Sequence, residues 1–583
     1  MGLALLTLFA FAAAGRAGAE GGGASDLVEQ GRRIYMDGAL ISGSELSGLR
    51  GSGVASLGAA AACTNCHRPS GMGSVESDIQ MLPISRAYLF PRSGDAPVAV
   101  MDLRFQHAMN VHHAPYTDAT LARALREGVN SDGKPMNELM PRFALDDADM
   151  AALTAYLKQL SSELSPGVTE TRLQLATVIA PGVTPERRKA FIETLRAAVT
   201  QKNGSVRPTG RHMVSAAEMM LKTEHFWDLH VWELKGEPST WRAQLEDFYR
   251  AQPVFAVLSG ISESTWQPVQ DFCQAQTLPC LFPSIDLVPE QGSFYSLYYS
   301  RGVQLEADVL ARYLADRESG RPKRVIQVAR DDEVGRAATA QLAKALEGSG
   351  IEVQSRMLAA AAKPEFGAAL KGVNSADAVM FWLRRADVAA LDKTGLPAGT
   401  VYFSGRLAGG ELAPFPQAWR KQLRMVYPYM LPEPRRVGIG AFEGWQRANH
   451  LPVVDEPMQA EIFFAAVTTS ETQAEMLNNY YRDYMIERQE EEISRREAGK
   501  AEQLSRDLAS AKNDAARRER EQISAEREQM KTDPSRMTRR ESTTFYPRLG
   551  LSVGQHIASK GAYIVHFTGK GDDLAADSDW IVP

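Results

Sequence analysis

Residues Cys63-Thr64-Asn65-Cys66-His67 carry two thiols three positions apart, followed at once by an imidazole. This spacing is the attachment pattern of a c-type haem, in which each thiol adds to one vinyl group of the porphyrin. The histidine is then held where a ring nitrogen can ligate the iron. A bare C-x-x-C also serves thiol–disulfide exchange or half of a zinc site, but neither needs the histidine, and the chain has no second C-x-x-C. We therefore predict one covalently attached haem c, held by Cys63, Cys66 and His67.

Two helical segments flank this motif and could position it. Ser25–Gly38 has helical periodicity and ends on a glycine, and Asp146–Leu157 begins with acidic residues that favour a helix N-terminus. Together with the haem motif, Gly31-Arg32-Arg33-Ile34-Tyr35 and Leu139-Met140-Pro141-Arg142-Phe143 resemble the class I cytochromes c. The resemblance implies an all-α domain over residues 24–164, in which the first and last helices pack across each other.

The sixth ligand of the iron decides which chemistry such a domain performs. The cytochrome family places its distal methionine in a Met-Pro pair, and the resemblance implies that Met140 is the axial thioether and, with His67, the metal ligand. Met136, one of the histidines His107, His112 and His113, or an open iron site remain alternatives, with Met140 then only filling the core. A six-coordinate iron has no position for substrate, which favours electron transfer over haem catalysis such as peroxidase activity.

The N-terminus has the features of a secretory signal peptide over residues 1–19. Leu3–Ala14 is an apolar run, and Ala17-Gly18-Ala19 offers a small-x-small cleavage pattern, although the first residues lack Lys and Arg. The run is shorter than the ~20 residues that span a bilayer, and no other stretch is apolar enough to do so. We expect export to the periplasm with cleavage near Ala19, where covalent haem attachment takes place. An uncleaved membrane anchor is the alternative.

The overall composition is that of a globular protein with several domains. Its 583 residues suggest three or four domains at about 150 residues each. A hydrophobic content of 44% with 23% charged residues allows large cores to be buried. The formal net charge of −6 gives no reason to expect nucleic acid as a partner.

Beyond residue 171, short apolar strands alternate with helical segments, which predicts parallel sheets built from crossover units. We expect a helix at Pro185–Val199 and strands at Leu173–Ala180, Asp228–Leu234, Val254–Leu258, Cys280–Phe282, Arg324–Val328, Ile351–Met357, Ala378–Leu383 and Thr400–Phe403. These strands are too many for one small sheet, so we predict two lobes, divided near Ser300–Gly302. No glycine-rich dinucleotide fingerprint follows the first strand, and no phosphate-binding loop occurs.

Four stretches of this region resemble the type I periplasmic binding proteins of branched-chain amino-acid ABC transporters. They are Val254–Gly260, Leu278–Ser284, Tyr298–Gly302 and Val325–Asp332. The resemblance implies a two-lobed α/β domain over residues 171–486, hinged around a cleft that binds a small organic solute such as an amino acid or a related acid.

The same resemblance suggests which side chains would contact that solute. In the family, hydroxyl groups hold a carboxylate, while an acidic residue and aromatic rings hold an ammonium group. By position, Ser259, Ser262 and Ser284 would face the cleft from the first lobe, and Tyr299 and Asp331 would contribute from the crossover and the second lobe. Each also has a structural interpretation, because strand-end serines satisfy turn amides and aspartate caps helices.

Cys273 and Cys280 lie at the end of one helix and the start of the next strand. In an oxidising compartment they could form a disulfide, and two buried thiols are the alternative. The spacing alone does not decide between the two arrangements.

The last third of the chain is predicted to contain a helix, a charged insertion and a closing tail. Glu461–Ile486 has helical character and could pack on the second lobe. Residues 487–541 are rich in Glu, Lys, Arg, Gln and Ala and predict a solvated helical insertion, with a short coiled coil as the alternative. Residues 542–583 suggest a short β tail that packs on the binding domain. Its Tyr-Pro-Arg-Leu and Ser-Lys-Gly-Ala-Tyr stretches resemble binding-protein relatives found beside quinoprotein alcohol dehydrogenases.

The sequence therefore predicts a multidomain chain in which an all-α cytochrome c domain precedes a two-lobed α/β binding domain. The predicted function is periplasmic electron transfer by a monohaem cytochrome, accessory to a periplasmic dehydrogenase or another redox protein. A periplasmic solute receptor whose haem senses or tunes redox state is the alternative. We expect no enzymatic activity.

Overall fold

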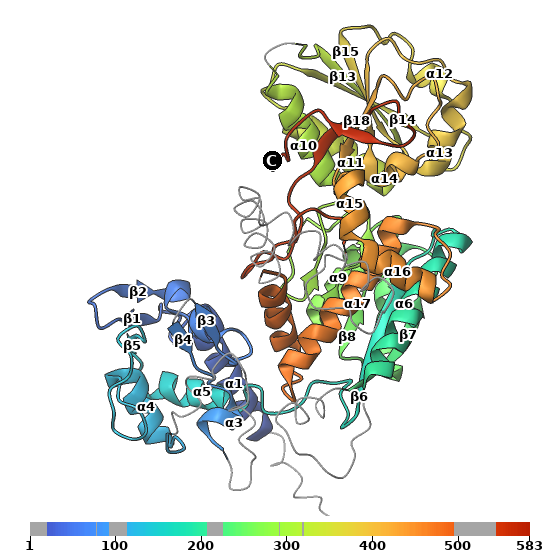
Figure 1. Ribbon diagram of the computed structural model, residues 1–583. Helices are drawn as coiled ribbons and strands as arrows, with labels where there is room; N and C mark the ends of the chain where they lie inside the picture. The colour runs from blue at the N-terminus through green and yellow to red at the C-terminus, as the bar shows by residue number, and fades with distance from the viewer. Residues whose placement is uncertain are drawn as a thin grey trace, which may run out of the picture. The chain divides into compact units, whose positions relative to one another are not determined.

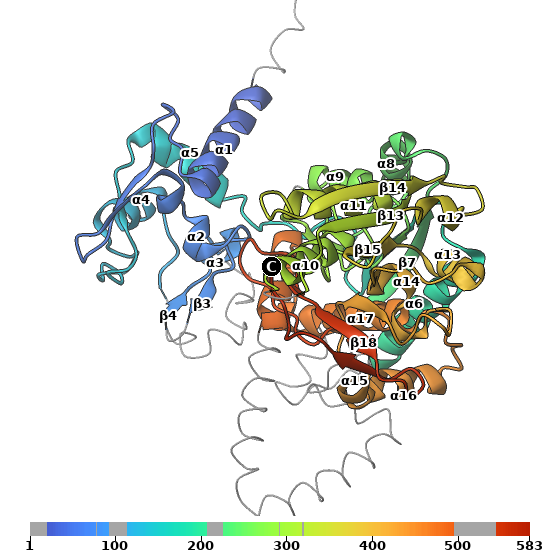
Figure 2. The same ribbon diagram turned by 90° about the horizontal axis from the view of Figure 1, so that it is seen from above.

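The structure, a computed structural model, describes residues 20–76, 79–91, 113–206, 225–290, 292–317, 320–494 and 544–583. The predicted signal peptide, His107, His112 and residues 495–541 of the predicted insertion lie outside these ranges. The chain forms two compact units (Figures 1 and 2), the first comprising Met1–Leu164 with Leu477–Tyr484 and the second Ser165–Met476 with Met485–Pro583. No helix within the described ranges is both long and apolar enough to span a bilayer.

The first unit is organised by two crossing helices, as the sequence predicts. Helix α1 (Glu20–Asp37) packs against α5 (Asp147–Leu157), and both views show them side by side (Figures 1 and 2). A Cβ atom on Gly31 of α1 would lie 2.0 Å from the carbonyl oxygen of Ala152 in α5. Only glycine permits this approach of the two backbones.

Shorter elements complete the first unit around a core that includes the buried side chains of Ile34, Tyr35 and Leu153. Strands β1 and β5 pair antiparallel, so the segment that follows Met140 runs beside residues 47–49. The remaining elements are β1 (Ser47–Leu49), β2 (Ala55–Leu57), η1 (Gly58–Ala61), α2 (Thr64–His67), β3 (Ser74–Glu76), β4 (Ile79–Met81), α3 (Arg86–Leu89), α4 (Asp118–Glu127) and β5 (Arg142–Phe143).

The first lobe of the second unit is a parallel sheet covered by helices. Its strand order is β11-β9-β6-β8-β10-β12, and β7 pairs with β6. The elements are β6 (Arg172–Ile179), α6 (Pro185–Ser205), β7 (Phe226–Glu233), η4 (Pro238–Thr240), α8 (Trp241–Ala251), β8 (Ala256–Leu258), β9 (Ile261–Ser262), α9 (Gln267–Ala275), β10 (Cys280–Leu281), β11 (Ser284–Ile285) and β12 (Ser296–Leu297). The short strands β9, β11 and β12 were not predicted, because two residues carry no periodicity.

The second lobe is a sheet of order β14-β13-β15-β16-β17-β18-β19. Strands β13 to β17 are parallel, and the tail adds β18 and β19 antiparallel, with Arg424 of β17 opposite His566 of β18. The elements are α10 (Val303–Ala315), β13 (Arg324–Arg330), α11 (Glu333–Ala345), β14 (Glu352–Leu358), α12 (Phe366–Ala369), β15 (Asp377–Trp382), α13 (Arg385–Ala390), η5 (Leu391–Lys393), β16 (Thr400–Ser404), α14 (Gly405–Ala408), η6 (Gly410–Leu412), β17 (Leu423–Tyr427), β18 (Tyr563–Phe567) and β19 (Leu574–Ala576). Helices α15 (Pro432–Gly438) and α16 (Gly440–Ala448) follow β17 on the way back to the first lobe, where Trp445 of α16 packs on Phe463.

The chain crosses between the lobes three times. It passes from β12 to α10, returns from β17 to α17 (Glu456–Met476), and crosses again in the tail, where Ile557 bridges to Tyr298 before β18 joins the second lobe. The predicted division near Ser300–Gly302 coincides with the first crossing. Two lobes joined by several chain crossings form the two-lobed α/β architecture that the sequence predicts.

The helix predicted over Glu461–Ile486 differs from the prediction in two respects. Helix α17 ends at Met476, where Leu477 adopts a left-handed φ of 54°, and a second helical stretch covers residues 482–494. The helix packs on α6 and β11 of the first lobe, not on the second lobe. Since α17 is buried on nearly all sides, its apolar pattern does not indicate which lobe it covers.

The described start of the predicted insertion is also not a solvated surface. Glu487, Arg488 and Glu490 are buried. Arg488 pairs with Glu475 of α17, and Glu490 with His556 of the tail at 2.7 Å. The prediction of an exposed helix is wrong for these residues, because the charges are paired within the second unit.

Candidate functional site

The haem-attachment motif forms a single helical turn in the first unit. Helix α2 starts directly after Cys63, whose carbonyl oxygen accepts a hydrogen bond from the His67 amide at 2.9 Å. Cys63 and Cys66 both keep their thiols. Burial raises the pKa of the Cys63 thiol to about 12. A thiol with a raised pKa does not suit thiol–disulfide exchange, which uses cysteines of lowered pKa.

The imidazole of His67 is oriented by the loop that follows the motif. Its Nδ1 lies 3.0 Å from the carbonyl oxygen of Leu82. A carbonyl only accepts, so Nδ1 carries the proton and Nε2 presents a lone pair. Burial lowers the pKa of His67, against the opposing effect of the Leu82 hydrogen bond, and keeps the ring neutral. A neutral imidazole whose second nitrogen donates to a backbone carbonyl is the form in which histidine ligates metals.

Met140 contributes a thioether to the same core. Met140 and Cys63 are both half-buried and pack against one hydrophobic cluster, which includes Phe143 and Leu153. Met136 is not part of that cluster. Apolar walls, a neutral imidazole nitrogen and a thioether are together the donor set and surroundings that a haem requires, so the residues present fit this cofactor. The axial role of Met140 stays a prediction.

The described histidine among the alternatives occupies an aromatic pocket. The ring of His113 lies 5.1 Å from that of Tyr88 and 5.0 Å from that of Tyr116. Its Nδ1 lies 2.9 Å from the carbonyl oxygen of Ala114. His113 is therefore held by its own neighbours.

The three predicted cleft serines gather at the carboxyl end of the first-lobe sheet. Ser259 is buried with a φ of 57°, and its Oγ has no hydrogen-bond partner within the described part of the chain. Ser262 instead uses its Oγ in a turn, where it donates to the Thr265 carbonyl oxygen at 3.0 Å. Ser284 is buried, and its amide donates to Gly260 at 2.8 Å.

The other two predicted contacts have different surroundings. Tyr299 is buried, its hydroxyl donates to the carbonyl oxygen of Glu461, and its ring stacks on Tyr546 with centroids 5.6 Å apart. Asp331 is half-exposed and pairs with Arg336 at 2.6 Å. The structure therefore joins Tyr299 to a buried polar cluster, whereas Asp331 belongs to a surface ion pair.

That buried cluster lies where the lobes meet and was not predicted. Asp286, which follows β11, pairs with Arg384 and with Arg406, both from the second lobe. Burial opposes ionisation of Asp286, but the arginines outweigh it and lower its pKa to about 2. Glu306 accepts from Ser404 and from the Arg406 amide, yet burial dominates and raises its pKa to about 8.

A sequence signal for this cluster existed. Asp286, Arg384 and Arg406 each stand directly after, or two residues after, a parallel strand. Side chains at the carboxyl ends of parallel strands converge at one edge of a sheet, where ligands of α/β proteins bind. No comparable signal pointed to Leu82, because its contribution to the haem site is a backbone oxygen.

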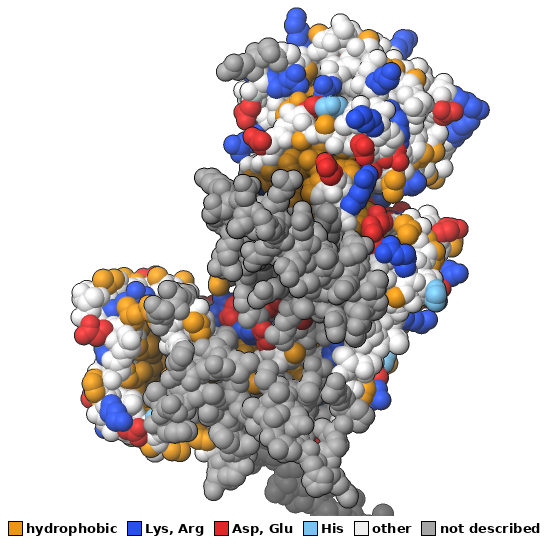
Figure 3. Space-filling view, in the orientation of Figure 1, with side chains coloured by type: hydrophobic (Ala, Val, Ile, Leu, Met, Phe, Trp, Pro, Cys, Tyr) orange, Lys and Arg blue, Asp and Glu red, His pale blue; other side chains and the backbone are white. Residues whose placement is uncertain are grey.

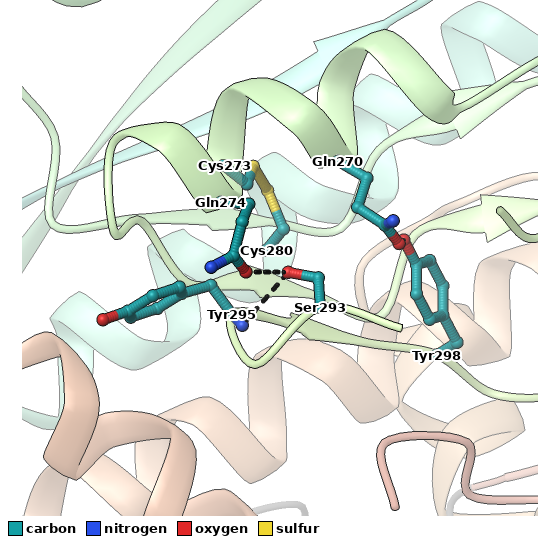
Figure 4. The surroundings of a disulfide bond; sticks show 7 residues. All are labelled: Gln270, Cys273, Gln274, Cys280, Ser293, Tyr295 and Tyr298. Atoms are coloured by element: carbon teal, nitrogen blue, oxygen red, sulfur yellow. Dashed lines mark hydrogen bonds between the residues drawn. A yellow bond between two sulfur atoms is a disulfide. The ribbon is translucent and has the colours of Figure 1, made fainter. Parts of the chain in front are cut away.

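Cys273 and Cys280 are joined by a disulfide that links α9 to β10, with Cα atoms 6.3 Å apart (Figure 4). Neighbouring hydrogen bonds run from Tyr298 Oη to Gln270 (2.7 Å) and from Ser293 Oγ to Gln274 (2.7 Å). Both cysteines are buried, so the bond stabilises the first lobe and takes no part in the interface.

Family models match both units of the chain. A model described as cytochrome c matches residues 54–161, and one described as periplasmic binding protein matches residues 196–411. The chain is a cytochrome c domain fused to a periplasmic binding protein domain. The cofactor of a cytochrome c domain is covalently attached haem c, and Cys63 and Cys66 have the spacing that its attachment requires.

The solved structures to which the chain is similar include substrate-binding proteins of ABC transporters. The fatty acid-binding protein of Thermomonospora curvata is 12% identical, covers 72% of this chain and 95% of its own, and gives a TM-score of 0.48. A branched-chain amino-acid ABC transporter protein of Thermus thermophilus with bound valine is 12% identical. The match covers 71% of this chain and 97% of that protein, with a TM-score of 0.48. A solute-binding protein of R. palustris in complex with benzoate is 11% identical. The match covers 71% of this chain and 98% of that protein, with a TM-score of 0.47. No curated protein matches the chain.

Proposed function

We propose that this protein is a periplasmic electron carrier, in which the cytochrome c domain accepts electrons from a periplasmic dehydrogenase and passes them to another redox protein. The observation that carries the proposal is the orientation of His67. Its Nδ1 is committed to the Leu82 carbonyl, which leaves Nε2 as the lone-pair donor to iron. When bound, the haem supplies one-electron exchange between ferrous and ferric iron.

The residues of the first unit support transfer without substrate binding. Met140 packs in the same cluster as Cys63, where its thioether would complete a six-coordinate iron and raise the reduction potential. Such an iron leaves no position for peroxide or another substrate. We therefore infer that the protein is not itself an enzyme.

Exposed apolar side chains of the first unit would suit a transient redox partner. Leu49, Leu57 and Leu139 are exposed hydrophobic side chains of the first unit, and hydrophobic side chains are visible on its face in Figure 3. Exposed apolar patches are common at sites where proteins associate. The tail stretches that resemble relatives found beside quinoprotein alcohol dehydrogenases favour such an enzyme as the donor.

Reduction by a candidate donor tests this function. Stopped-flow mixing of the ferric protein with a periplasmic quinoprotein alcohol dehydrogenase and its alcohol should give the ferrous c-type spectrum. Met140→Ala should lose the weak methionine-to-iron absorption band and lower the potential by on the order of 0.1 V, since axial ligands tune haem over about 0.8 V. Because its reduction potential is lower, Met140→Ala should also be reduced more slowly than the wild type.

If the dehydrogenase reduced neither the wild type nor Met140→Ala, the assignment of this enzyme as the electron donor would be wrong. An intact methionine band in Met140→Ala would separately contradict the axial role of that residue.

A solute receptor is the second candidate, and Ser259 favours it. A buried hydroxyl that has no partner among the described residues, held in a left-handed conformation, is the kind of group that a ligand satisfies. A thermal-shift screen of amino acids and small acids should then find a stabilising solute, by RT ln(1 + [L]/Kd). Ser259→Ala should abolish that shift, whereas an equal shift in the variant would exclude this serine as a contact.

A further inference from the structure

Arg406 reaches from the second lobe into a pocket made by other parts of the second unit. Its Nε donates to Asp286 Oδ1 at 3.1 Å, and its Nη2 donates to the carbonyl oxygen of Ile285 at 2.7 Å. Its Nη1 donates to the Tyr546 hydroxyl at 2.9 Å and to Glu461 Oε1 at 3.2 Å. All three guanidinium nitrogens thus have acceptors, and the side chain is only 7% exposed.

The groups around this guanidinium form a cation site. Asp286 and Glu461 contribute carboxylates, and Tyr546, which also donates to Glu461 at 2.8 Å, contributes a hydroxyl. The rings of Tyr299 and Tyr429 pack on that of Tyr546, with centroids 5.6 and 5.5 Å away. Carboxylates held by tyrosines in a buried, aromatic setting bind guanidinium and ammonium groups strongly.

The pocket belongs mainly to the first lobe. Ile285 ends strand β11 and Asp286 follows it, and Glu461 lies on α17, which packs on α6 and β11. Arg406 itself follows β16 of the second lobe, where its own amide donates to Glu306 at 2.9 Å. The cation and its acceptors therefore come from opposite lobes.

A second arginine reinforces the same contact. Arg384 follows β15 of the second lobe, pairs with Asp286, and donates through Nη2 to the carbonyl oxygen of Glu263 at 2.6 Å. The Glu263 carboxylate is in turn paired with Arg187 of α6. Asp286 thus forms ion pairs with two arginines from the second lobe.

We propose that the first lobe carries a binding site for guanidinium or primary ammonium groups, and that Arg406 of the second lobe fills it as an internal ligand. The tethered cation closes the lobes on each other without a solute. A cationic solute would have to displace Arg406 to enter. The inference does not depend on the electron-transfer role of the haem domain.

Chemical complementation of Arg406→Ala in the full-length, haem-loaded protein tests the site. Isothermal titration with methylguanidinium should show saturable binding to the variant and none to the wild type. Methylurea, which has a similar shape but no charge, should bind the variant at least about tenfold more weakly, because charge-assisted hydrogen bonds are lost. Equal affinity for the two compounds, or no binding of methylguanidinium, would overturn the proposal.

Hydrogen exchange tests the closure. Arg406→Ala should speed exchange of backbone amides on both sides of the interface, at residues 284–287 and 404–408. The matched control is Arg330→Ala, which removes a largely buried guanidinium whose partners, Asp387 and the carbonyl oxygens of Ala359 and Ala362, all belong to the second lobe. Its effect should stay within the second lobe, away from residues 284–287.

A second variant guards against loss of folding in Arg406→Ala. Asp286→Asn leaves Arg406 in place but weakens both interlobe ion pairs, and it should speed exchange at the same amides. If the amides of residues 284–287 exchanged at the wild-type rate in both Arg406→Ala and Asp286→Asn, Arg406 would not be holding the lobes together.

Discussion

The haem motif of the first unit and Asp286 of the second unit differ in the charge state of their buried ionisable groups. At the haem motif, burial keeps the groups neutral: it raises the pKa of the Cys63 thiol and lowers that of His67. At the lobe interface, Asp286 stays charged in the interior because Arg384 and Arg406 pair with it. Neutral donors suit an apolar macrocycle, whereas buried charges must be satisfied by partners. The first site is thus adapted to a cofactor, and the second is satisfied by the chain itself.

The largest effect should come from removing the haem attachment. Cys63→Ala combined with Cys66→Ala should abolish covalent haem completely, because no thiol then remains to form a thioether. The spectrum after denaturation and solvent extraction measures this. The second unit should keep its own cooperative urea transition, since its core shares no residue with the attachment motif. If haem stayed attached to the variant, or if the second unit also lost its cooperative urea transition, the contrast between the two units would not hold.

The next largest effect should follow from breaking the interlobe charges. Asp286→Asn leaves two arginines without their shared carboxylate, and the loss of one partner of a buried pair costs about 3–5 kcal/mol of unfolding free energy. Since the pKa of Asp286 is lowered to about 2, its contribution is present above pH 3.8 and is lost as pH falls through about 2. Urea unfolding near neutral pH measures the loss. A change below about 1 kcal/mol would mean that the cluster is not tightly coupled.

Glu306 should give the interface the opposite pH dependence. Burial raises its pKa from 4.5 to about 8, so between these values the folded chain holds a proton that the unfolded chain has released. Its stabilising contribution is complete below pH 4.5 and is lost as pH rises to about 8. The unfolding free energy of the wild type should therefore fall between pH 5 and 8, and Glu306→Gln should flatten that slope. Parallel slopes for the two proteins would show that Glu306 is ionised in the fold.

The smallest effect should come from the surface pair of Asp331 and Arg336. Both side chains are more than half exposed, and such pairs contribute at most about 1 kcal/mol. Arg336→Ala should leave thermal unfolding nearly unchanged. A large loss, comparable with that of Asp286→Asn, would show that Asp331 belongs to a coupled network after all.

Local patterns in the sequence predict the parts of this molecule that depend on neighbours in the chain. The haem motif and the long strands follow from spacing and periodicity, whereas the crossing of α1 and α5 follows from the resemblance to class I cytochromes c. The Arg406 site escaped prediction because its acceptors at residues 285, 286, 461 and 546 meet only after three crossings between the lobes. The sequence does not indicate which lobe α17 covers, because the helix is buried on nearly every side. Asp331 matches a family position, yet it lies in an ion pair at the surface.

Axial coordination of the iron by both His67 and Met140 would make the haem domain a closed electron carrier. Exposure of the dithionite-reduced, full-length protein to carbon monoxide tests it most directly, because carbon monoxide binds ferrous haem only where an axial position is open or easily vacated. We expect a c-type spectrum that carbon monoxide leaves unchanged in the wild type, and loss of this resistance in Met140→Ala. A wild-type spectrum that shifts at once to the carbon monoxide form would show that the iron has an open axial position.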